Sequence, residues 1–171
     1  GNMYNNVIGA VQAALSREGF STLRFNFRGT GKSEGSYADG IGEEDDVRGA
    51  VEFVIEQADL HLPLMLVGYS FGAAVGAHAV VGDLRVKALI CISPPVETYD
   101  FSFLKEDIRP KFFVAGDRDD VCPVKPLQGF FHSLPQPRSL KIFPGVDHFW
   151  GGMEERMAES MVDFLRGLEW G

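Results

Sequence analysis

The sequence contains little cysteine and little positive charge. Only two of its 171 residues are cysteines, and 16 Lys and Arg residues are outnumbered by 24 Asp and Glu residues, which gives a formal net charge of −8. Cys91, in an apolar run, and Cys122, in a loop, do not suggest a disulfide framework, so the sequence predicts a reducing, cytoplasmic location. The acidic balance argues against nucleic acid and anionic membrane surfaces as partners, because both require basic patches.

The sequence also has no apolar run long enough to span a bilayer, no visible signal peptide and no spacing typical of metal ligands. No membrane, metal or cofactor is therefore expected, and no signal points to a particular oligomeric state. The chain is 45% apolar and 12% aromatic, which is typical of a globular protein with a sizeable core. Residues 1–171 are predicted to form one domain.

Continuous apolar runs alternate with segments of helical periodicity along the chain. Such runs, separated by helices, are typical of a parallel sheet buried on both faces, which places the fold in the α/β class. The predicted strands are Thr22–Phe27, Leu64–Val67, Val86–Ile92, Phe112–Ala115 and Leu140–Phe143. The predicted helices are Tyr4–Arg17, Glu43–Gln57, Phe71–Val80, Lys125–His132 and Met153–Leu168.

The most informative motif is Gly68-Tyr69-Ser70-Phe71-Gly72, which directly follows the apolar run Leu64–Val67 and precedes a helix of small residues. This order is typical of a nucleophile elbow, in which a serine on a sharp strand-to-helix turn points its hydroxyl outward. The flanking glycines are expected to leave room for strand and helix to approach closely. The helix N-terminus supplies free N–H groups, so the N–H of Phe71 is the candidate oxyanion donor.

A nucleophilic serine needs a base, and the sequence offers four histidines. His61 precedes the strand that carries Ser70, while His78 and His132 fall in predicted helices. His148 follows the strand-like run Ser139–Phe143 and a Pro-Gly turn. That places it at the carboxyl end of a strand, where open α/β sheets hold their chemistry, so His148 is the favoured base.

The acid that orients the base is expected between serine and histidine in the chain. The buried run Lys111–Ala115 leads into a loop with three aspartates, Asp117, Asp119 and Asp120. Asp117 lies so close to the strand end that turn hydrogen bonds are expected of it. Asp120 is expected to cap the next segment or to face solvent. Asp119 is therefore favoured, although the residues alone leave the choice among the three open.

These motifs together resemble the α/β-hydrolase superfamily, and more narrowly its small, lidless, esterase-like members near dienelactone hydrolase. The resemblance implies nucleophile Ser70, acid Asp119 and base His148, and the choice of Asp119 depends on it most. The matching stretches are Asn26-Phe27-Arg28-Gly29-Thr30-Gly31-Lys32-Ser33-Glu34-Gly35, Gly68-Tyr69-Ser70-Phe71-Gly72-Ala73, Gly116-Asp117-Arg118-Asp119 with Val121-Cys122-Pro123, and Gly145-Val146-Asp147-His148-Phe149.

One departure from the family pattern concerns the strand and loop that should precede the first helix. In the family order that strand lies between those expected here at Thr22–Phe27 and Leu64–Val67. Without it the two would lie roughly 10 Å apart with unpaired backbone between them. The resemblance therefore implies that N-terminal strands, with the second oxyanion donor, are missing from this chain. In a rival interpretation, Met3 is the natural start.

A different class of function is suggested by Gly29-Thr30-Gly31-Lys32-Ser33, which is similar to the end of a phosphate-binding loop. That motif requires an earlier glycine where this chain has Asn26, and a helix that begins at the serine. Neither requirement is met, so nucleotide binding is disfavoured. Arg28 is instead expected to hold this loop by hydrogen bonds, and Gly29 and Gly31 to allow a tight turn.

The substrate is expected to bind in an open site. Only Ser93–Arg109 separates two strands where related folds insert a lid, and this is too short for a helical cap. Tyr69, Trp150 and Phe149 flank the candidate catalytic residues and are predicted to form a wall for substrate. We expect hydrolysis of small or medium acyl esters or thioesters. The alternatives are another acyl transfer or perhydrolysis with the same residues, and a non-catalytic binding or scaffold protein.

Overall fold

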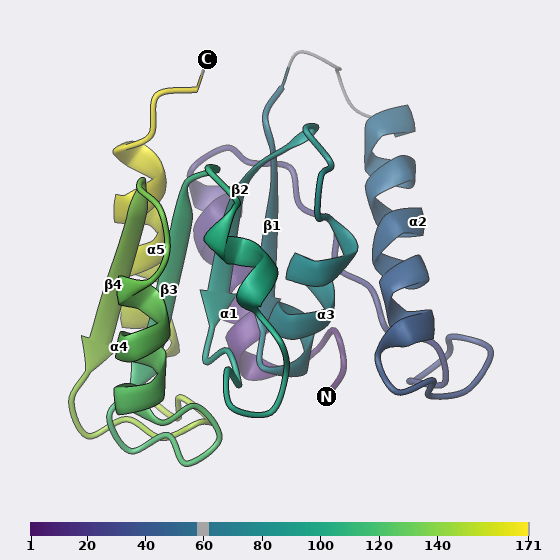
Figure 1. Cartoon of the computed structure of the whole chain (residues 1–171). Coiled ribbons are helices and arrows are strands. Elements are labelled where there is room, and N and C mark those ends of the chain that lie inside the picture. The colour runs from purple at the N-terminus through teal and green to yellow at the C-terminus, as the bar shows by residue number, and fades with distance from the viewer. Residues whose placement is uncertain (58–61, 171) are drawn as a thin grey trace.

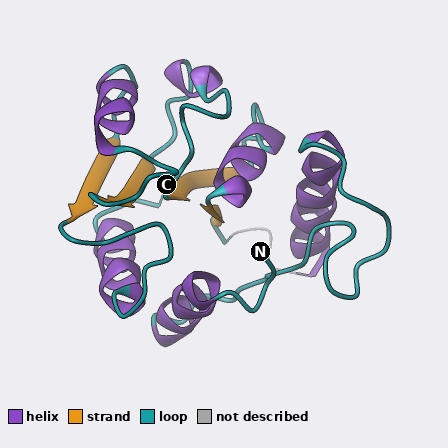
Figure 2. Ribbon diagram, turned by 90° about the horizontal axis from the view of Figure 1, so that it is seen from below, coloured by secondary structure: helices purple, strands orange, loops and turns teal. Residues whose placement is uncertain are grey.

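Four parallel strands form the centre of the protein in a computed structural model that describes residues 1–57 and 62–170. Helices cover both faces of the sheet (Figures 1 and 2). The strands are β1 (Leu64–Tyr69), β2 (Val86–Ile92), β3 (Lys111–Gly116) and β4 (Arg138–Phe143). The helices are α1 (Asn6–Arg17), α2 (Ile41–Gln57), α3 (Phe71–Ala79), α4 (Val124–His132) and α5 (Glu154–Arg166), and a 3-10 turn, η1, spans Ser102–Lys105.

The strands lie in the order β1-β2-β3-β4, so each strand is hydrogen-bonded to its neighbour in sequence. The pairing continues just past the strand ends, where the N–H of Ser70 donates to the carbonyl of Ile92 at 2.9 Å and the N–H of Ser93 donates to that of Val114 at 2.7 Å. The two serines that follow β1 and β2 are therefore fixed by the sheet itself, at its carboxyl edge.

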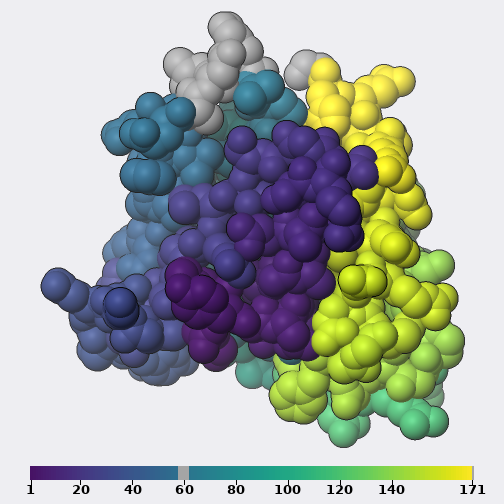
Figure 3. Space-filling model, turned by 180° about the vertical axis from the view of Figure 1, so that it is seen from behind, coloured from purple at the N-terminus to yellow at the C-terminus, as the bar shows by residue number. Residues whose placement is uncertain are grey.

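Each face of the sheet has its own apolar core. One core joins α2, α3 and α4 to the sheet, and the other joins α1 and α5 to the opposite face. Seen from behind, α1 near the N-terminus lies beside the C-terminal helix α5 (Figure 3). The central strands β2 and β3 are buried almost throughout, whereas β4 alternates between partly buried and exposed positions, as an edge strand does.

The expectation of a strand at Thr22–Phe27 is wrong for the chain as the structure describes it. The segment has no regular secondary structure, and within residues 1–57 and 62–170 no ladder joins it to β1. A strand requires a neighbour for its backbone groups. The segment is tied to the N-terminus by side chains instead: the Asn26 side chain accepts from the N–H of Met3 at 2.7 Å, and Arg24 donates to the Met3 carbonyl at 3.0 Å.

The loop after this segment has the structural role predicted for it. Arg28 forms an ion pair with Asp46 of α2 at 2.8 Å. Gly29 and Gly31 have φ of 70° and 60°, which favour glycine. The hydroxyl of Ser33 donates to the backbone carbonyl of residue 26 at 2.9 Å, and the next helix begins only at Ile41. The loop therefore lacks the helix start that a phosphate-binding loop needs.

None of the helices in the described ranges combines the length and the apolarity needed to cross a membrane.

Candidate active site

Ser70 lies at a sharp turn between β1 and α3. Its φ of 54° and ψ of −121° are rare for a residue other than glycine, and its side chain makes no capping hydrogen bond to the helix. The hydroxyl is therefore free to project from the turn. Phe71 is the first residue of α3, so its N–H has no carbonyl partner inside the helix.

The two glycines around the turn have different roles. A Cβ added at Gly68 would lie 2.5 Å from the Cα of Ala73 and 2.5 Å from the carbonyl oxygen of Gly72, both of them backbone atoms. A Cβ added at Gly72 would have no neighbour within 4 Å. Only Gly68 is needed for the close approach of strand and helix, so the expectation that both glycines make room holds for one of them.

We expect Gly68→Ala to destabilise the protein by about 1–3 kcal/mol, the usual cost of overpacking, because rigid backbone atoms would have to move. The matched variant Gly72→Ala sits in open space within a helix and should leave the melting temperature unchanged or slightly raised. Thermal unfolding of both variants followed by circular dichroism measures the difference. Equal melting temperatures for the two variants would contradict this explanation of the turn.

Three side chains from three different strand ends meet at the carboxyl edge of the sheet. Nε2 of His148 lies 2.9 Å from Oγ of Ser70, and Nδ1 of His148 lies 2.9 Å from both carboxylate oxygens of Asp119. These residues follow β4, β1 and β3 respectively. An imidazole whose Nδ1–H donates to the carboxylate leaves Nε2 to accept the serine proton, so the arrangement suits nucleophilic catalysis.

Asp119 is held as an ionised, oriented carboxylate. Its side chain is completely buried, and one oxygen accepts the backbone N–H groups of Val121 at 2.9 Å and Cys122 at 2.8 Å. Burial alone would raise the pKa of this carboxyl, but hydrogen bonds from His148, Ser93 and the N–H of Cys122 outweigh burial and hold the pKa below its ordinary value. The group therefore stays charged where it faces the imidazole.

The other two aspartates of this loop do not reach the imidazole. Asp117 is exposed, and its carboxylate accepts the N–H of Gly145 at 2.6 Å, which is the turn hydrogen bonding expected of it. Asp120 is exposed. Cys122 in the same loop is fully buried.

Tyr69 lies against His148. The two rings are stacked with centroids 5.3 Å apart, and the tyrosine hydroxyl donates to the backbone carbonyl of His148 at 2.7 Å. Burial and the carboxylates of Asp119 and Asp147 raise the pKa of Tyr69 to about 12, so the hydroxyl keeps its proton at neutral pH. The side chain predicted to contact substrate therefore uses its hydroxyl to hold the backbone of the histidine.

The prediction that Trp150 lines the substrate wall is wrong, because its side chain is 0% exposed. The indole packs edge-on against Phe143 with centroids 5.5 Å apart, and its Nε1–H donates to the hydroxyl of Ser93 at 3.0 Å. Sequence reasoning did not identify Ser93. The signal available was its place directly after β2, the same carboxyl-edge position that identified His148.

Two of the remaining histidines have other partners. Nδ1 of His78 lies 2.7 Å from the carboxylate of Glu44, and Nδ1 of His132 lies 2.7 Å from the backbone carbonyl of Gln128. His61 lies outside the described residues. Within the described ranges, no group of three or more His, Cys, Asp or Glu side chains is placed to hold a metal ion.

Aromatic side chains contact His148 and Phe71, the residue that follows Ser70. Phe149 is 70% exposed, and its ring lies edge-on to that of His148. Phe71 contacts the rings of Tyr37 and Tyr99, with centroids 6.0 and 5.9 Å away. Of these rings, Phe149 and Tyr37 are largely exposed.

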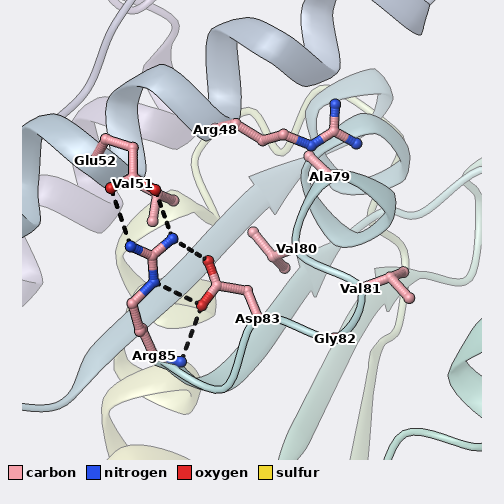
Figure 4. A pocket seen from close by; sticks show the side chains of 9 residues that line it. All are labelled: Arg48, Val51, Glu52, Ala79, Val80, Val81, Gly82, Asp83 and Arg85. Atoms are coloured by element: carbon pink, nitrogen blue, oxygen red, sulfur yellow. Dashed lines mark hydrogen bonds and ion pairs between the residues drawn. The ribbon is translucent and has the colours of Figure 1, made fainter.

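A hollow with a volume of about 310 Å³ lies elsewhere, between α2 and the turn that leads into β2 (Figure 4). There the guanidinium of Arg85 bonds the carboxylates of Glu52 and Asp83 at 2.6 and 2.8 Å. Arg48, on the rim, pairs with Glu44 at 2.7 Å. The ion pair between Arg85 and Glu52 thereby joins α2 to the turn that leads into β2.

Comparison with known proteins identifies the family to which the chain belongs. Residues 1–121 match the sequence profile of a family described as having the alpha/beta hydrolase fold. A protein of Rickettsia prowazekii (strain Madrid E), itself uncharacterized, is 32% identical over 173 residues, which cover 96% of this chain and 73% of that protein.

Solved structures give the same answer. An alpha-beta serine hydrolase homologue from Coxiella burnetii is 33% identical, with a TM-score of 0.87 over 99% of this chain and 79% of that one. A member of the α/β serine hydrolases without lid, from Xanthomonas campestris, is 32% identical, with a TM-score of 0.86 over 97% of this chain and 75% of that one.

Proposed function

The chain belongs to the α/β-hydrolase family, and from that premise we propose that it is a serine hydrolase that cleaves small or medium acyl esters or thioesters through an acyl-enzyme. The observation that carries the proposal is the position of His148, whose two ring nitrogens lie 2.9 Å from Ser70 and from Asp119. Nucleophile, base and orienting acid are the three parts that such a reaction needs.

In the proposed mechanism, Nε2 of His148 takes the proton of Ser70 as Oγ forms a bond to the substrate carbonyl carbon. The tetrahedral intermediate then expels the alcohol or thiol, which receives that proton from His148. Water attacks the acyl-serine with His148 again as base, and the acid product leaves with Ser70 restored. Asp119 holds the imidazole in the required tautomer and stabilises its cation.

The N–H of Phe71 is the proposed donor to the oxyanion, because it is free of the helix and adjacent to the nucleophile. Such a donor contributes roughly 3–4 kcal/mol to transition-state stabilisation. The second donor is not assigned. Phe149 and the outer face of Tyr69 are the proposed contacts for the acyl or alcohol group.

The proposed substrate range rests on the segment between β2 and β3. Residues 93–110 contain only the short turn η1 and no cap helix, which supports a serine side without a lid. Two buried, unpaired cysteines support the further proposal of a cytoplasmic location.

Hydrolysis of p-nitrophenyl esters of increasing chain length tests this proposal. We expect turnover of the acetate and butyrate esters with a stoichiometric burst of p-nitrophenol wherever deacylation is slower than acylation, and little turnover of the palmitate. Heat-unfolded protein supplies the background rate. No turnover of any ester or thioester by folded protein would favour a binding protein on this fold.

A further inference from the structure

The loop between β4 and α5 (residues 144–153), which carries His148, is held by side chains from other parts of the chain. The hydroxyl of Tyr69, the last residue of β1, donates to the backbone carbonyl of His148 at 2.7 Å. The side-chain amide of Asn6, the first residue of α1, donates to the next carbonyl, that of Phe149, at 3.0 Å. Two successive carbonyls of the β4–α5 loop are therefore tied to residues 79 and 143 positions away in the sequence.

The amide of Asn6 is itself oriented by a second partner. Its nitrogen also donates to a carboxylate oxygen of Glu154, the first residue of α5, at 2.7 Å. A side-chain amide nitrogen carries two hydrogens, so the two acceptors use both of them. Because α1 and α5 share the apolar core on one face of the sheet, the position from which Asn6 reaches the loop is fixed as well (Figure 3). Asn6 is therefore an oriented donor, although it lies on the exposed surface.

Tyr69 connects the base to the strand of the nucleophile. It immediately precedes Ser70, and its ring is stacked on the imidazole of His148 with centroids 5.3 Å apart. The stacking and the hydrogen bond act on the same residue, so the strand that ends at the nucleophile also holds the base. Nε2 of His148 lies 2.9 Å from Oγ of Ser70, which is the distance that proton transfer requires.

The backbone of the β4–α5 loop bends sharply just past the base. Trp150 has a φ of 63°, a conformation that is rare for residues other than glycine and persists only where the surroundings hold it. Its carbonyl accepts the N–H of Met153 at 2.8 Å, and its indole donates to the hydroxyl of Ser93 at 3.0 Å. The bend is therefore anchored at Trp150 itself, whereas Tyr69 and Asn6 hold the two residues that precede it.

We propose that Tyr69 and Asn6 are positioning residues for His148, and that their hydrogen bonds to the loop backbone keep the imidazole within reach of Ser70. A single methylene group joins the imidazole to the backbone, so a shift of the backbone carries the ring with it. A displacement of about 1 Å at a reacting group can lower a rate by about 10²-fold, so even slight loosening of the loop has a measurable effect. The inference rests on the proposed function, because the position of His148 matters only if it acts as the base.

Tyr69→Phe is expected to lower kcat for p-nitrophenyl butyrate about fivefold to tenfold with KM little changed, because it removes the hydrogen bond and keeps the ring. The retained ring preserves both the stacking on His148 and the proposed contact with substrate. Tyr4→Phe is the matched control. Tyr4 is 70% exposed and its ring faces the guanidinium of Arg24, so the loss of its hydroxyl should leave kcat unaffected.

Asn6→Ala is expected to lower kcat about twofold to fivefold, because the carbonyl of Phe149 loses its donor. Asn6→Asp keeps the size of the side chain but cannot donate from an ionised carboxylate, so it should lower kcat at least as much. Asn2→Ala is the matched control, since the Asn2 side chain accepts the N–H of Tyr4 at 2.8 Å and its loss should leave kcat unaffected. Combining Asn6→Ala with Tyr69→Phe should lower kcat more than either change alone.

Labelling with a fluorophosphonate, a reagent that phosphonylates activated serines, separates positioning from a loss of folded protein. A displaced base slows the phosphonylation of Ser70, but every chain is labelled in the end. Misfolding of part of the sample instead lowers the final labelled fraction at an unchanged rate. We expect Tyr69→Phe and Asn6→Ala to reach one adduct per chain at a reduced rate, and a lowered labelled fraction at the wild-type rate would overturn the inference.

A double-mutant cycle with His148→Ala tests whether the effect passes through the base. Tyr69→Phe should have little further effect on kcat in the His148→Ala background. A wild-type kcat in Tyr69→Phe or in Asn6→Ala would overturn the inference for that residue, and an equal fall with and without the imidazole would overturn it for Tyr69. If His148→Ala itself retained full turnover, the proposed function would fail as well, and the two failures are thereby distinguishable.

Discussion

Replacing Ser70 by alanine is expected to lower kcat/KM for a short acyl ester by at least about 10⁴-fold, as the loss of a nucleophile does in serine hydrolases that use this constellation. No other hydroxyl lies within hydrogen-bonding distance of Nε2 of His148 in the described part of the chain. The alanine variant should keep its fold, because the Ser70 side chain makes no capping bond to α3. Initial rates on p-nitrophenyl butyrate measure the effect.

The control for this experiment is Ser160→Ala, which removes a serine hydroxyl that donates to the carbonyl of Met157 within α5. Its rate should equal that of the wild type, and both variants should unfold at the wild-type temperature. If Ser70→Ala kept a tenth or more of the wild-type rate, with the protein free of contaminating esterase, another group would be the nucleophile.

Replacing Asp119 by asparagine is expected to lower kcat by about 10³–10⁴-fold with little change in size or packing. Both carboxylate oxygens lie 2.9 Å from Nδ1 of His148, and asparagine replaces one of them by an amide nitrogen that only donates, which favours the tautomer with the proton on Nε2, where it cannot accept the serine proton. The loss of charge also removes the stabilisation of the imidazolium. Steady-state rates of Asp119→Asn and of a neighbouring control, Asp120→Asn, measure the difference.

Asp120 is the appropriate control because it is exposed and lies next in the same loop. Its asparagine variant should retain the wild-type kcat. If Asp120→Asn or Asp117→Asn proved more harmful than Asp119→Asn, the acid would be misassigned among the three aspartates.

The order of strands and helices could be predicted because the strands are marked by their local composition. β2 and β3 are buried on both faces, so their sequences are continuous apolar runs that stand out from the helices. Thr22–Phe27 has the composition of a strand as well, but a strand also needs a partner for its backbone, and composition does not reveal whether one is present. Whether Thr22–Phe27 forms a strand depends on a neighbouring strand, which its own composition does not reveal.

The site was predictable to the extent that its residues follow strand ends. Ser70 and His148 could be named from their local context, and Asp119 only with the help of a family resemblance. Trp150 could not be placed correctly, because the left-handed backbone at φ 63° turns its ring into the core. Ser93 belongs to a segment with no motif, and its hydroxyl bonds Trp150, a residue far along the chain.

The central claim is that Ser70 is an activated nucleophile in the folded protein. Intact-mass analysis after treatment with a fluorophosphonate tests it directly, because this reagent phosphonylates serines whose hydroxyl is activated by a neighbouring base. The account predicts one adduct per chain, mapped to Ser70 by peptide sequencing, lost in Ser70→Ala and strongly slowed in His148→Ala. A folded protein that formed no adduct, or an adduct at another residue, would contradict it.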